Sequence, residues 1–390
     1  MAIWVLGILL FVVVSGGNKG GVAASGGGGG CGFPAVYTFG DDNSDTGGNA
    51  AALDNLVLPN GQTFFGKPSG RYCDGRLIID FIAEHLGLPF LSAYLDSYGS
   101  NFSHGANFAM GGEYVAKDDS GLSLGGQVFQ FIQFKSRTTA LYNQLKDHSV
   151  EESPLKSILP RPEDFSKALY IIDMGQNDLA NSTFYFPTNA TLLLQYARSV
   201  TIPKMILEFS RLISILHEYE GAMFFWIHNV GPIGCLPHTV KSCLKAIQGC
   251  ELDQNGCAKF RDEMAQEFNG LLKEEVSKAR GKYPKATFTY VDLYAAKHNL
   301  ITQAKNLGFE DPMEFCCGSY DDVYVRCGQK PLNGNGTVIG STSTCKDPSK
   351  YISWDGIHFT EKANQLVAEL ILNGSLSDPP ISLSEACRNP

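Results

Sequence analysis

The sequence predicts one α/β domain built on a mostly parallel sheet that is covered by helices. Short runs rich in β-branched and aromatic residues are bounded by turn residues, and helical patterns lie between them. These runs are Ala35–Phe39, Leu169–Asp173, Met223–His228 and Thr287–Asp292. Such alternation is typical of a parallel sheet with helices on its faces. The amino-acid composition does not change markedly along the rest of the chain, which favours a single domain.

The composition excludes several classes of protein. The 390 residues are 44% hydrophobic and 18% charged, which argues against a disordered, collagen-like or small disulfide-scaffold chain. The 31 Lys and Arg residues stand against 40 Asp and Glu residues, a formal net charge of −9, and no basic block could follow a phosphate backbone. We therefore expect no nucleic-acid partner.

The N-terminus is expected to be a secretory signal peptide, residues 1–25. An apolar run from Trp4 to Val14 is followed by small residues that include Ala23-Ala24-Ser25, a suitable cleavage region. The run is too short for a comfortable membrane span, so a signal anchor is only the alternative and no stable span is expected. The remaining parts are predicted as a glycine-rich leader (26–34), the main domain (35–374) and a C-terminal tail (375–390).

Two further features favour the secretory pathway. Eleven cysteines exceed what a reduced cytosolic chain usually carries, and their clustering after residue 230 indicates disulfides. Paired C-x-x-C spacing is absent, so no metal site is expected, and the odd count leaves at least one thiol unpaired. Sequons predict N-glycans at Asn101, Asn181, Asn189, Asn335 and Asn373.

Two helices can be placed along the chain with their ends. The first carries apolar residues on one face from Phe260 to Val276 and is expected to end near Gly281 and Pro284. The second is expected to begin after Thr360 and to stop at Asn373-Gly374.

Polar turns follow two of the predicted strands, where open α/β sheets collect their ligands. The first strand runs into Gly40-Asp41-Asp42-Asn43-Ser44-Asp45, in which glycine permits a tight turn and Asp or Ser can cap a helix. The second runs into Gly175-Gln176-Asn177-Asp178, which is either a plain turn or an amide aimed into a cleft.

Near the C-terminus, Asp355 precedes His358 by three residues, a spacing that lets a carboxylate orient an imidazole. Seven other histidines are present, and a lone histidine is more often structural than catalytic. Four cysteines are expected to tie down the loop that carries this pair, although spacing does not settle their connectivity: Cys316, Cys317, Cys327 and Cys345.

Taken in order, these blocks resemble the plant branch of the GDSL esterase/lipase family, within the SGNH hydrolases. The resemblance covers nearly the whole mature chain, and the chain looks most like the early-nodulin, latex-allergen-like and secreted acetylesterase relatives. The blocks are Phe39 to Gly48, Gly70-Arg71 with Asp74 to Phe81, Gly105-Ala106-Asn107-Phe108-Ala109, Gly175 to Asp178, Gly231 to Pro237, Cys316-Cys317-Gly318, and Asp355 with His358.

The resemblance implies a three-layer α/β/α, flavodoxin-like fold and hydrolysis of carboxylic esters by a serine nucleophile. The family's base maps onto His358 and its orienting acid onto Asp355. Its oxyanion donors map onto the backbone N–H of Gly105 and the side-chain amide of Asn177, joined by the backbone N–H of the nucleophile position. We expect no cofactor, a small-molecule ester or an acylated metabolite or glycan as partner, and an apoplastic or vacuolar location.

One position departs from the family pattern. The residue after Gly-Asp in the first block is the nucleophilic serine in the family, and here it is Asp42. Ser44 points about 200° away on a helical start, so it is a poor stand-in and is expected to be a cap. Loss of the nucleophile costs a serine hydrolase on the order of a million-fold in rate. A second carboxylate beside His358 should also favour imidazolium and weaken it as a base.

Three hypotheses follow from this substitution. In the first, the protein is a catalytically silent binder of an ester, glycan or other metabolite, and Asp42 can simply cap a helix. In the second, Asp42 transfers protons as an acid or base, or activates water with help from His358; its attack on an ester is less attractive because a reactive anhydride would form. In the third, weak ester hydrolysis or acyl transfer persists through water or another hydroxyl.

Overall fold

The structure is a computed structural model. It describes residues 30–54, 56–116, 121–147, 153–180, 189–319, 325–330 and 344–388. The expected signal peptide lies outside the described residues, and one compact unit begins at Cys31. The expected leader and tail both contribute to this unit, because a disulfide joins Cys31 to Cys387.

A six-stranded sheet in the order β2-β1-β3-β4-β5-β6 forms the centre of the unit. All neighbouring strands are parallel except β6, which pairs antiparallel with β5. The bounds are β1 (Val36–Gly40), β2 (Gly105–Asn107), β3 (Leu169–Asp173), β4 (Phe224–His228), β5 (Thr287–Val291) and β6 (Ser377–Asp378). The four predicted strands are confirmed. Both edge strands escaped prediction because two or three residues show no periodicity.

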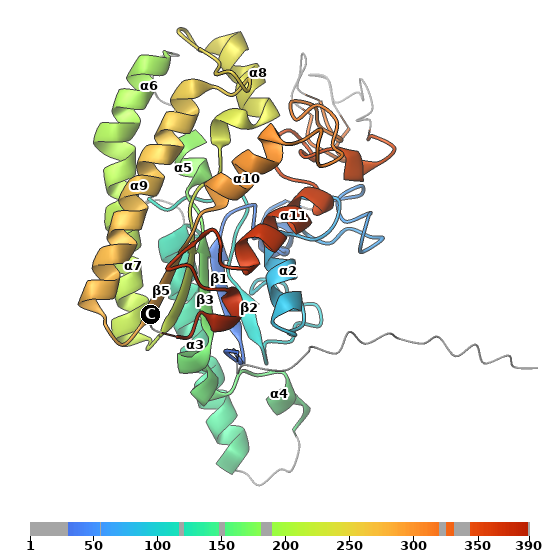
Figure 1. Cartoon of the computed structure of the whole chain (residues 1–390). Helices are drawn as coiled ribbons and strands as arrows, with labels where there is room; N and C mark the ends of the chain where they lie inside the picture. Colours follow the sequence, from blue (N-terminus) through green and yellow to red (C-terminus); the bar gives the residue numbers. More distant parts are fainter. Residues whose placement is uncertain are drawn as a thin grey trace, which may run out of the picture. The chain divides into compact units, whose positions relative to one another are not determined.

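Helices cover both faces of this sheet, so the predicted three-layer α/β/α arrangement is confirmed (Figure 1). One layer consists of α2 (Ile78–His85), α10 (Leu293–Thr302) and α11 (Glu361–Leu372). The other consists of α3 (Leu124–Asp147), α7 (Ile202–Ser214) and α9 (Lys259–Lys282). Shorter helices are α1 (Gly48–Ala52), α4 (Pro154–Ser157), α5 (Gln176–Ala180), α6 (Ala190–Tyr196) and α8 (Pro237–Ala246).

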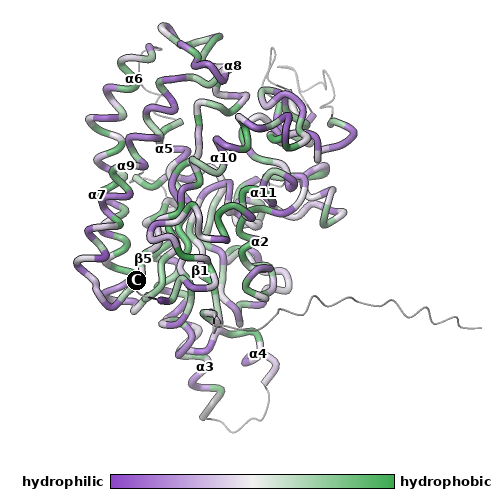
Figure 2. The backbone as a smooth tube through the Cα atoms, viewed as in Figure 1, coloured by the Kyte–Doolittle hydropathy of each residue, from purple (hydrophilic) through white to green (hydrophobic). Residues whose placement is uncertain are grey.

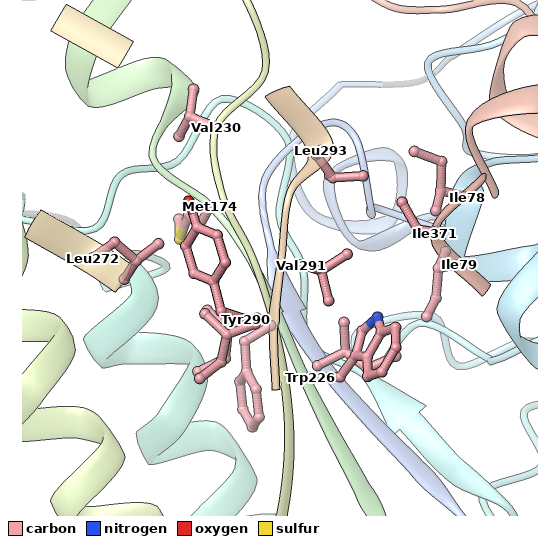
Figure 3. Close-up of a cluster of buried hydrophobic side chains, with 14 of the residues drawn as sticks. Ile78, Ile79, Met174, Trp226, Val230, Leu272, Tyr290, Val291, Leu293 and Ile371 are labelled. Carbon is pink, nitrogen blue, oxygen red and sulfur yellow. The ribbon is translucent and has the colours of Figure 1, made fainter. Parts of the chain in front are cut away.

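The strands are apolar on both faces because each face meets a helical layer. Figure 3 shows Trp226 and Val291 lying toward Ile371, whereas Met174 lies beside Leu272 on the opposite side of the sheet. Figure 2 shows purple and green alternating along the outer helices α7 and α9, as expected for helices with one face on the sheet and the other in solvent. Burying a large apolar side chain contributes about 1.5–3 kcal/mol, so these two interfaces are the main source of stability.

Both helices whose ends were predicted are confirmed. Helix α9 ends at Lys282, and α11 begins directly after Thr360, whose side chain accepts a hydrogen bond from the N–H of Ala363. Asn373 follows the last turn of α11, and Gly374 has a φ of 86°, the left-handed conformation that ends helices.

Candidate active site

The candidate site lies at the carboxyl ends of β1 and β3. Asp42 is the second residue after β1, and Asn177 stands in the first turn of α5, shortly after β3. Asp355 and His358 lie on the loop that leads into α11. Because β1 and β3 are parallel neighbours, their carboxyl ends bring residues 42 and 177 together although 135 positions separate them.

The turn that presents Asp42 is fixed by buried hydrogen bonds. The Gln127 side chain accepts from the N–H of Gly40 and donates to its carbonyl, both at 2.9 Å. The Ser44 hydroxyl is buried and donates to Asp173 over 2.7 Å, and Ser44 does not line the pocket at Asp42. The expectation that Ser44 caps a helix is therefore wrong, because its hydroxyl is a donor to a carboxylate on the neighbouring strand.

A neighbouring aspartate supplies the cap that the sequence suggested for this block. The Asp45 carboxylate accepts from the N–H groups of Gly47, Gly48 and Asn49 at the start of α1. Asp42 instead accepts from groups far away in the chain. The suggestion that Asp42 only caps a helix is therefore corrected by these contacts.

The two carboxylate oxygens of Asp42 have different surroundings. Oδ2 accepts from the backbone N–H of Gly112 at 2.8 Å and from Nδ2 of Asn177 at 2.9 Å. Oδ1 faces Nε2 of His358 across 3.6 Å, which is longer than an ordinary N–H···O hydrogen bond. Oδ2 thus accepts hydrogen bonds from two convergent donors, an arrangement of the kind that stabilises an oxyanion, whereas Oδ1 lies toward the imidazole.

His358 lies between two carboxylates. Its Nδ1 is 2.7 Å from Oδ2 of Asp355, whose other oxygen accepts from the N–H groups of Ile357 and His358. The His358 side chain is only 9% exposed, and the centre of its ring lies 5.0 Å from that of Tyr72. The three-residue spacing between acid and histidine therefore does orient the imidazole, as predicted.

The charges of this group follow from that geometry. Burial favours neutral His358, but the nearby charges and hydrogen bonds of Asp355 and Asp42 outweigh it and raise the pKa of His358 to about 10. Burial likewise favours neutral Asp42, but its interactions with His358, Asn177 and Gly112 lower the pKa of Asp42 to about 2. At neutral pH the pair is carboxylate and imidazolium.

A pocket of about 400 Å³ opens over this group. Polar and apolar residues share its wall, and an ion pair between Arg326 and Asp54 lies at it. The lining includes Asp42, Asn49, Leu53, Leu56, Asn60, Tyr72, Gly112, Asn177, Ile357 and His358. The space suits a small molecule that has both polar and apolar parts.

Disulfides brace the loops on one side of the pocket. Cys316 pairs with Cys345 and Cys317 with Cys327, and Cys327 itself lines the pocket. The N–H of Cys317 donates to the carbonyl of Trp354, next to Asp355. The prediction that these four cysteines tie down the loop of Asp355 and His358 agrees with these contacts.

The structure brings together four of the five site residues expected from the sequence, and Gly105 is the exception. Gly105 begins β2, pairs with Val36 at the amino end of β1, and donates its N–H to Phe102. Its expected place beside the site is therefore corrected, because the amino ends of parallel strands lie at the edge opposite the pocket. Gly112 brings the backbone N–H instead.

Two residues of the site were missed from the sequence. Gly112 has a φ of 80°, and its loop is held by Asp45, which accepts from Gly111, and by Asp178, which accepts from Val115. The glycine pair at 111–112 was the available clue. Tyr72, next to the recognised Gly70-Arg71 block, carried no clue to its role because an aromatic residue in a loop is usually core.

The remaining cysteines pair as Cys235–Cys257 and Cys243–Cys250, and Cys73 is a buried free thiol. The sulfurs of Cys235 and Cys257 also lie near a carboxylate of Asp262, but both are already bonded in the disulfide. That no metal or cofactor is needed stays a prediction.

Among the described residues, no helix is long and apolar enough to cross a membrane. Asn101 and Asn373 are exposed, and Asn189 is half-buried at the start of α6. The sequons at Asn181 and Asn335 lie outside the described residues. Glycosylation at all five stays a prediction.

Comparison with known proteins finds similarity along almost the whole chain. The model of the GDSL-like lipase/acylhydrolase family matches residues 36–371. The chain is 45% identical to a maize (Zea mays) protein named GDSL esterase/lipase ACHE, over 92% of this chain and 90% of that one. It is 43% identical to GDSL esterase/lipase ENOD8 of Medicago truncatula, with the same coverage. It is also 40% identical to a protein of Arabidopsis thaliana named Alpha-L-fucosidase 3, over 92% and 93%.

Proposed function

Because the chain belongs to the GDSL-like lipase/acylhydrolase family, we propose that it is a member in which ordinary serine-type ester hydrolysis is lost while the ligand pocket is kept. Its ligand is a small ester or an acylated metabolite or glycan. The observation that carries this proposal is the position of Asp42. Its Oδ2 accepts hydrogen bonds from the N–H of Gly112 and from Nδ2 of Asn177, the two donors that would stabilise an oxyanion.

Three properties of the site support the loss of ester hydrolysis. The position of the nucleophile carries no hydroxyl, and the Ser44 hydroxyl is engaged with Asp173. The donors of Gly112 and Asn177 already hold a full negative charge, so an ester carbonyl would have to displace it. A raised pKa also keeps His358 protonated at neutral pH, and an imidazolium cannot accept the proton of a nucleophile.

The pocket wall supports binding of a molecule that is polar at one end and apolar at the other. Asn49 and Tyr72 offer hydrogen-bonding groups, while Leu53 and Leu56 offer apolar contact. A short acyl group on a hydroxylated body satisfies both kinds of surface. A free carboxylate is a poorer ligand because it would meet the charge of Asp42.

The alternatives are less well supported by the same contacts. A pKa of about 2 makes Asp42 a weak base and leaves it no proton to give near neutral pH, which disfavours a simple acid/base role. Residual hydrolysis through water would need a neutral base near Asp42, whereas His358 is held as imidazolium.

We also propose that the protein is secreted, with residues 1–25 removed and N-glycans attached, and that it resides in the apoplast or the vacuole. Five disulfides support an oxidising compartment. Expression of the full chain in plant cells, followed by N-terminal sequencing and glycosidase treatment, tests this. Retention of the protein in the cytosol, or an unprocessed N-terminus, would contradict it.

The central experiment compares the parent protein with Asp42→Ser and Asp42→Asn on p-nitrophenyl acetate. We expect the parent and Asp42→Asn to stay at background, and Asp42→Ser to exceed the parent by at least about a hundred-fold, because it frees the donors and supplies a hydroxyl. Glu369→Gln on the exposed surface of α11 is the control variant and should behave as the parent. Hydrolysis of p-nitrophenyl acetate by the parent protein would contradict the proposed loss of ester hydrolysis.

Binding is measured separately on the inactive parent. Triacetin is expected to raise the thermal unfolding temperature in a concentration-dependent way, whereas glycerol at equal concentration is not. The absence of any difference between the two compounds, repeated with sugar acetates against the free sugars, would contradict the ligand assignment.

A further inference from the structure

The carboxylate of Asp42 is held in a manner suited to a nucleophile. Oδ2 is fixed by Gly112 and Asn177, while Oδ1 lies at the pocket next to His358 Nε2, 3.6 Å away. Carboxylates of proteins do form covalent intermediates when one oxygen can reach an electrophile. The orientation of the Asp42 carboxylate therefore suits attack by Oδ1 on an electrophile bound in the pocket.

Attack on a carbonyl carbon would form an anhydride, but attack on a saturated carbon would form an ordinary ester. We propose that Asp42 is a nucleophile toward the strained saturated carbon of an epoxide, and that the site hydrolyses epoxides to diols through a covalent ester on Asp42. This inference goes beyond the proposed function and shares with it only the premise that Asp42 has replaced the ester-cleaving nucleophile.

In the first step, a lone pair of Asp42 Oδ1 attacks a ring carbon of the epoxide. The bond between that carbon and the epoxide oxygen breaks, and its electron pair moves to the oxygen. The oxygen takes the proton from Nε2 of the His358 imidazolium. The products are a hydroxyalkyl ester of Asp42 and a neutral His358.

In the second step, neutral His358 takes a proton from a water molecule whose oxygen attacks Cγ of Asp42. The negative charge that develops on Oδ2 is already aligned with the donors of Gly112 and Asn177. Collapse breaks the bond between Cγ and Oδ1, and this oxygen leaves with the diol after taking the proton from His358. The new acid of Asp42 then returns its own proton to His358, which restores carboxylate and imidazolium.

The charge state of the site fits this order of steps. The raised pKa of His358 supplies the acid needed for ring opening, although it disables an esterase. Esterification removes the negative charge of Asp42, so the pKa of His358 falls when a base is needed. Asp355 holds the ring through Nδ1 in both steps.

Tyr72 provides a second donor at the same pocket. Its hydroxyl accepts a hydrogen bond from Asn49 Nδ2, which leaves the phenolic proton to point at a ligand. Burial, followed by the charges of Asp42 and Asp45, raises the pKa of Tyr72, so the group stays protonated. A hydrogen bond from Tyr72 to the epoxide oxygen would stabilise the charge that forms on ring opening.

The substrate class follows from the pocket. A volume of about 400 Å³ admits a small epoxide with one aryl or short alkyl substituent, and Leu53, Leu56 and Ile357 offer apolar contact to that substituent. Styrene oxide and 1,2-epoxyhexane are suitable probes.

The decisive test uses His358→Gln in the full chain, incubated with each probe and analysed by intact mass and peptide mapping. This variant removes both the acid of the first step and the base of the second, so ring opening is slower, with Tyr72 as the remaining donor to the epoxide oxygen, and the ester that forms is not hydrolysed. We therefore expect one epoxide mass to accumulate on Asp42 during a prolonged incubation. Double substitution with Asp42→Asn should abolish the adduct, and His358→Gln with Glu369→Gln should retain it. An unmodified Asp42 in His358→Gln after exposure to both probes would overturn the inference.

A single turnover of the parent in H₂¹⁸O gives an independent readout. Because the water oxygen stays on Cγ, the heavy isotope should enter the peptide that contains Asp42, while the first diol carries the unlabelled Oδ1. Heavy oxygen in the first diol with none in that peptide would overturn the covalent route. Diol formation should fall at least about a thousand-fold in Asp42→Asn.

These outcomes separate the inference from the proposed function. If the parent is inactive on p-nitrophenyl acetate, His358→Gln forms no adduct and the parent takes up no heavy oxygen in the Asp42 peptide, the proposed function stands and the inference is overturned. A parent that hydrolyses p-nitrophenyl acetate contradicts the proposed function, whereas the adduct and isotope results still decide the inference by themselves.

Discussion

The charge of His358 depends on Asp42, and the variant Asp42→Asn measures that dependence. Asparagine keeps the size of the side chain and an acceptor for Gly112 and Asn177, and it removes one negative charge 3.6 Å from Nε2. Two charges at that separation interact by about 1 kcal/mol in bulk water and about 5 kcal/mol at an effective dielectric constant of about 20.

Each 1.4 kcal/mol, roughly, changes a protonation constant tenfold, so the affinity of His358 for its proton should fall between about 7-fold and about 2,000-fold. The side chain of His358 is 9% exposed, and that of Asp42 is 14% exposed. A weakly solvated pair interacts more strongly than one in water, so we expect a fall of at least about a hundred-fold. The pKa of His358 should move from about 10 toward neutrality.

The assay is an NMR titration of the histidine Cε1 protons between pH 5 and pH 11 in the parent, in Asp42→Asn, and in His358→Gln, which assigns the resonance. Glu369→Gln serves as the control, since it removes an exposed charge on α11. A parent His358 that titrates near pH 6.5, or a midpoint that Asp42→Asn leaves in place, would refute the electrostatic account of the site.

Three other predictions concern the same site. The raised pKa of His358 should stabilise the folded state fully below about pH 6.5, and this stabilisation should disappear as the pH rises through about 10. The lowered pKa of Asp42 should stabilise the folded state above about pH 4, and this stabilisation should disappear as the pH falls through about 2. Urea unfolding across pH 5 to 11 should show the alkaline loss in the parent but not in His358→Gln. In an Asp42→Ser background, Gly112→Ala should reduce p-nitrophenyl acetate hydrolysis about a hundred-fold. A φ of 80° strains alanine by about 1–2 kcal/mol, and relief of this strain displaces the backbone N–H that acts as a donor. Unchanged turnover would show that Gly112 is not part of the site. Replacing both Cys317 and Cys327 by Ser should lower the free energy of unfolding by about 2–3 kcal/mol, since the bridge closes a loop with a sequence separation of 10. Urea unfolding checks this value, and an unchanged midpoint and slope would contradict it.

Much of the fold was accessible from the sequence because local patterns set it. The runs that became β1, β3, β4 and β5 are apolar in continuous stretches, as buried parallel strands must be. The ends of α11 were marked by Thr360 and by Asn373-Gly374, residues whose side chain or backbone acts within one turn. The edge strands β2 and β6 lack such a pattern, and they exist because a neighbouring strand offers hydrogen bonds.

The site was accessible in part for a similar reason. Asp355 and His358 meet across three residues, so their spacing alone carried the information. Gly105 was misplaced because a glycine in a motif does not reveal at which end of its strand the donor lies. Its register with Val36 decides that, and this register is a property of the sheet.

The sequence by itself determined the α/β class, the family, the pairing of Asp355 with His358 and the presence of Asp42 after Gly40-Asp41 in the first block. These follow from residue identity and from contacts within a few positions. Only the tertiary structure decided that one oxygen of Asp42 accepts hydrogen bonds from Gly112 and Asn177 while the other faces His358. Those residues lie far apart in the chain, and their distances, and hence their charges, are set by the packing of separate strands and loops.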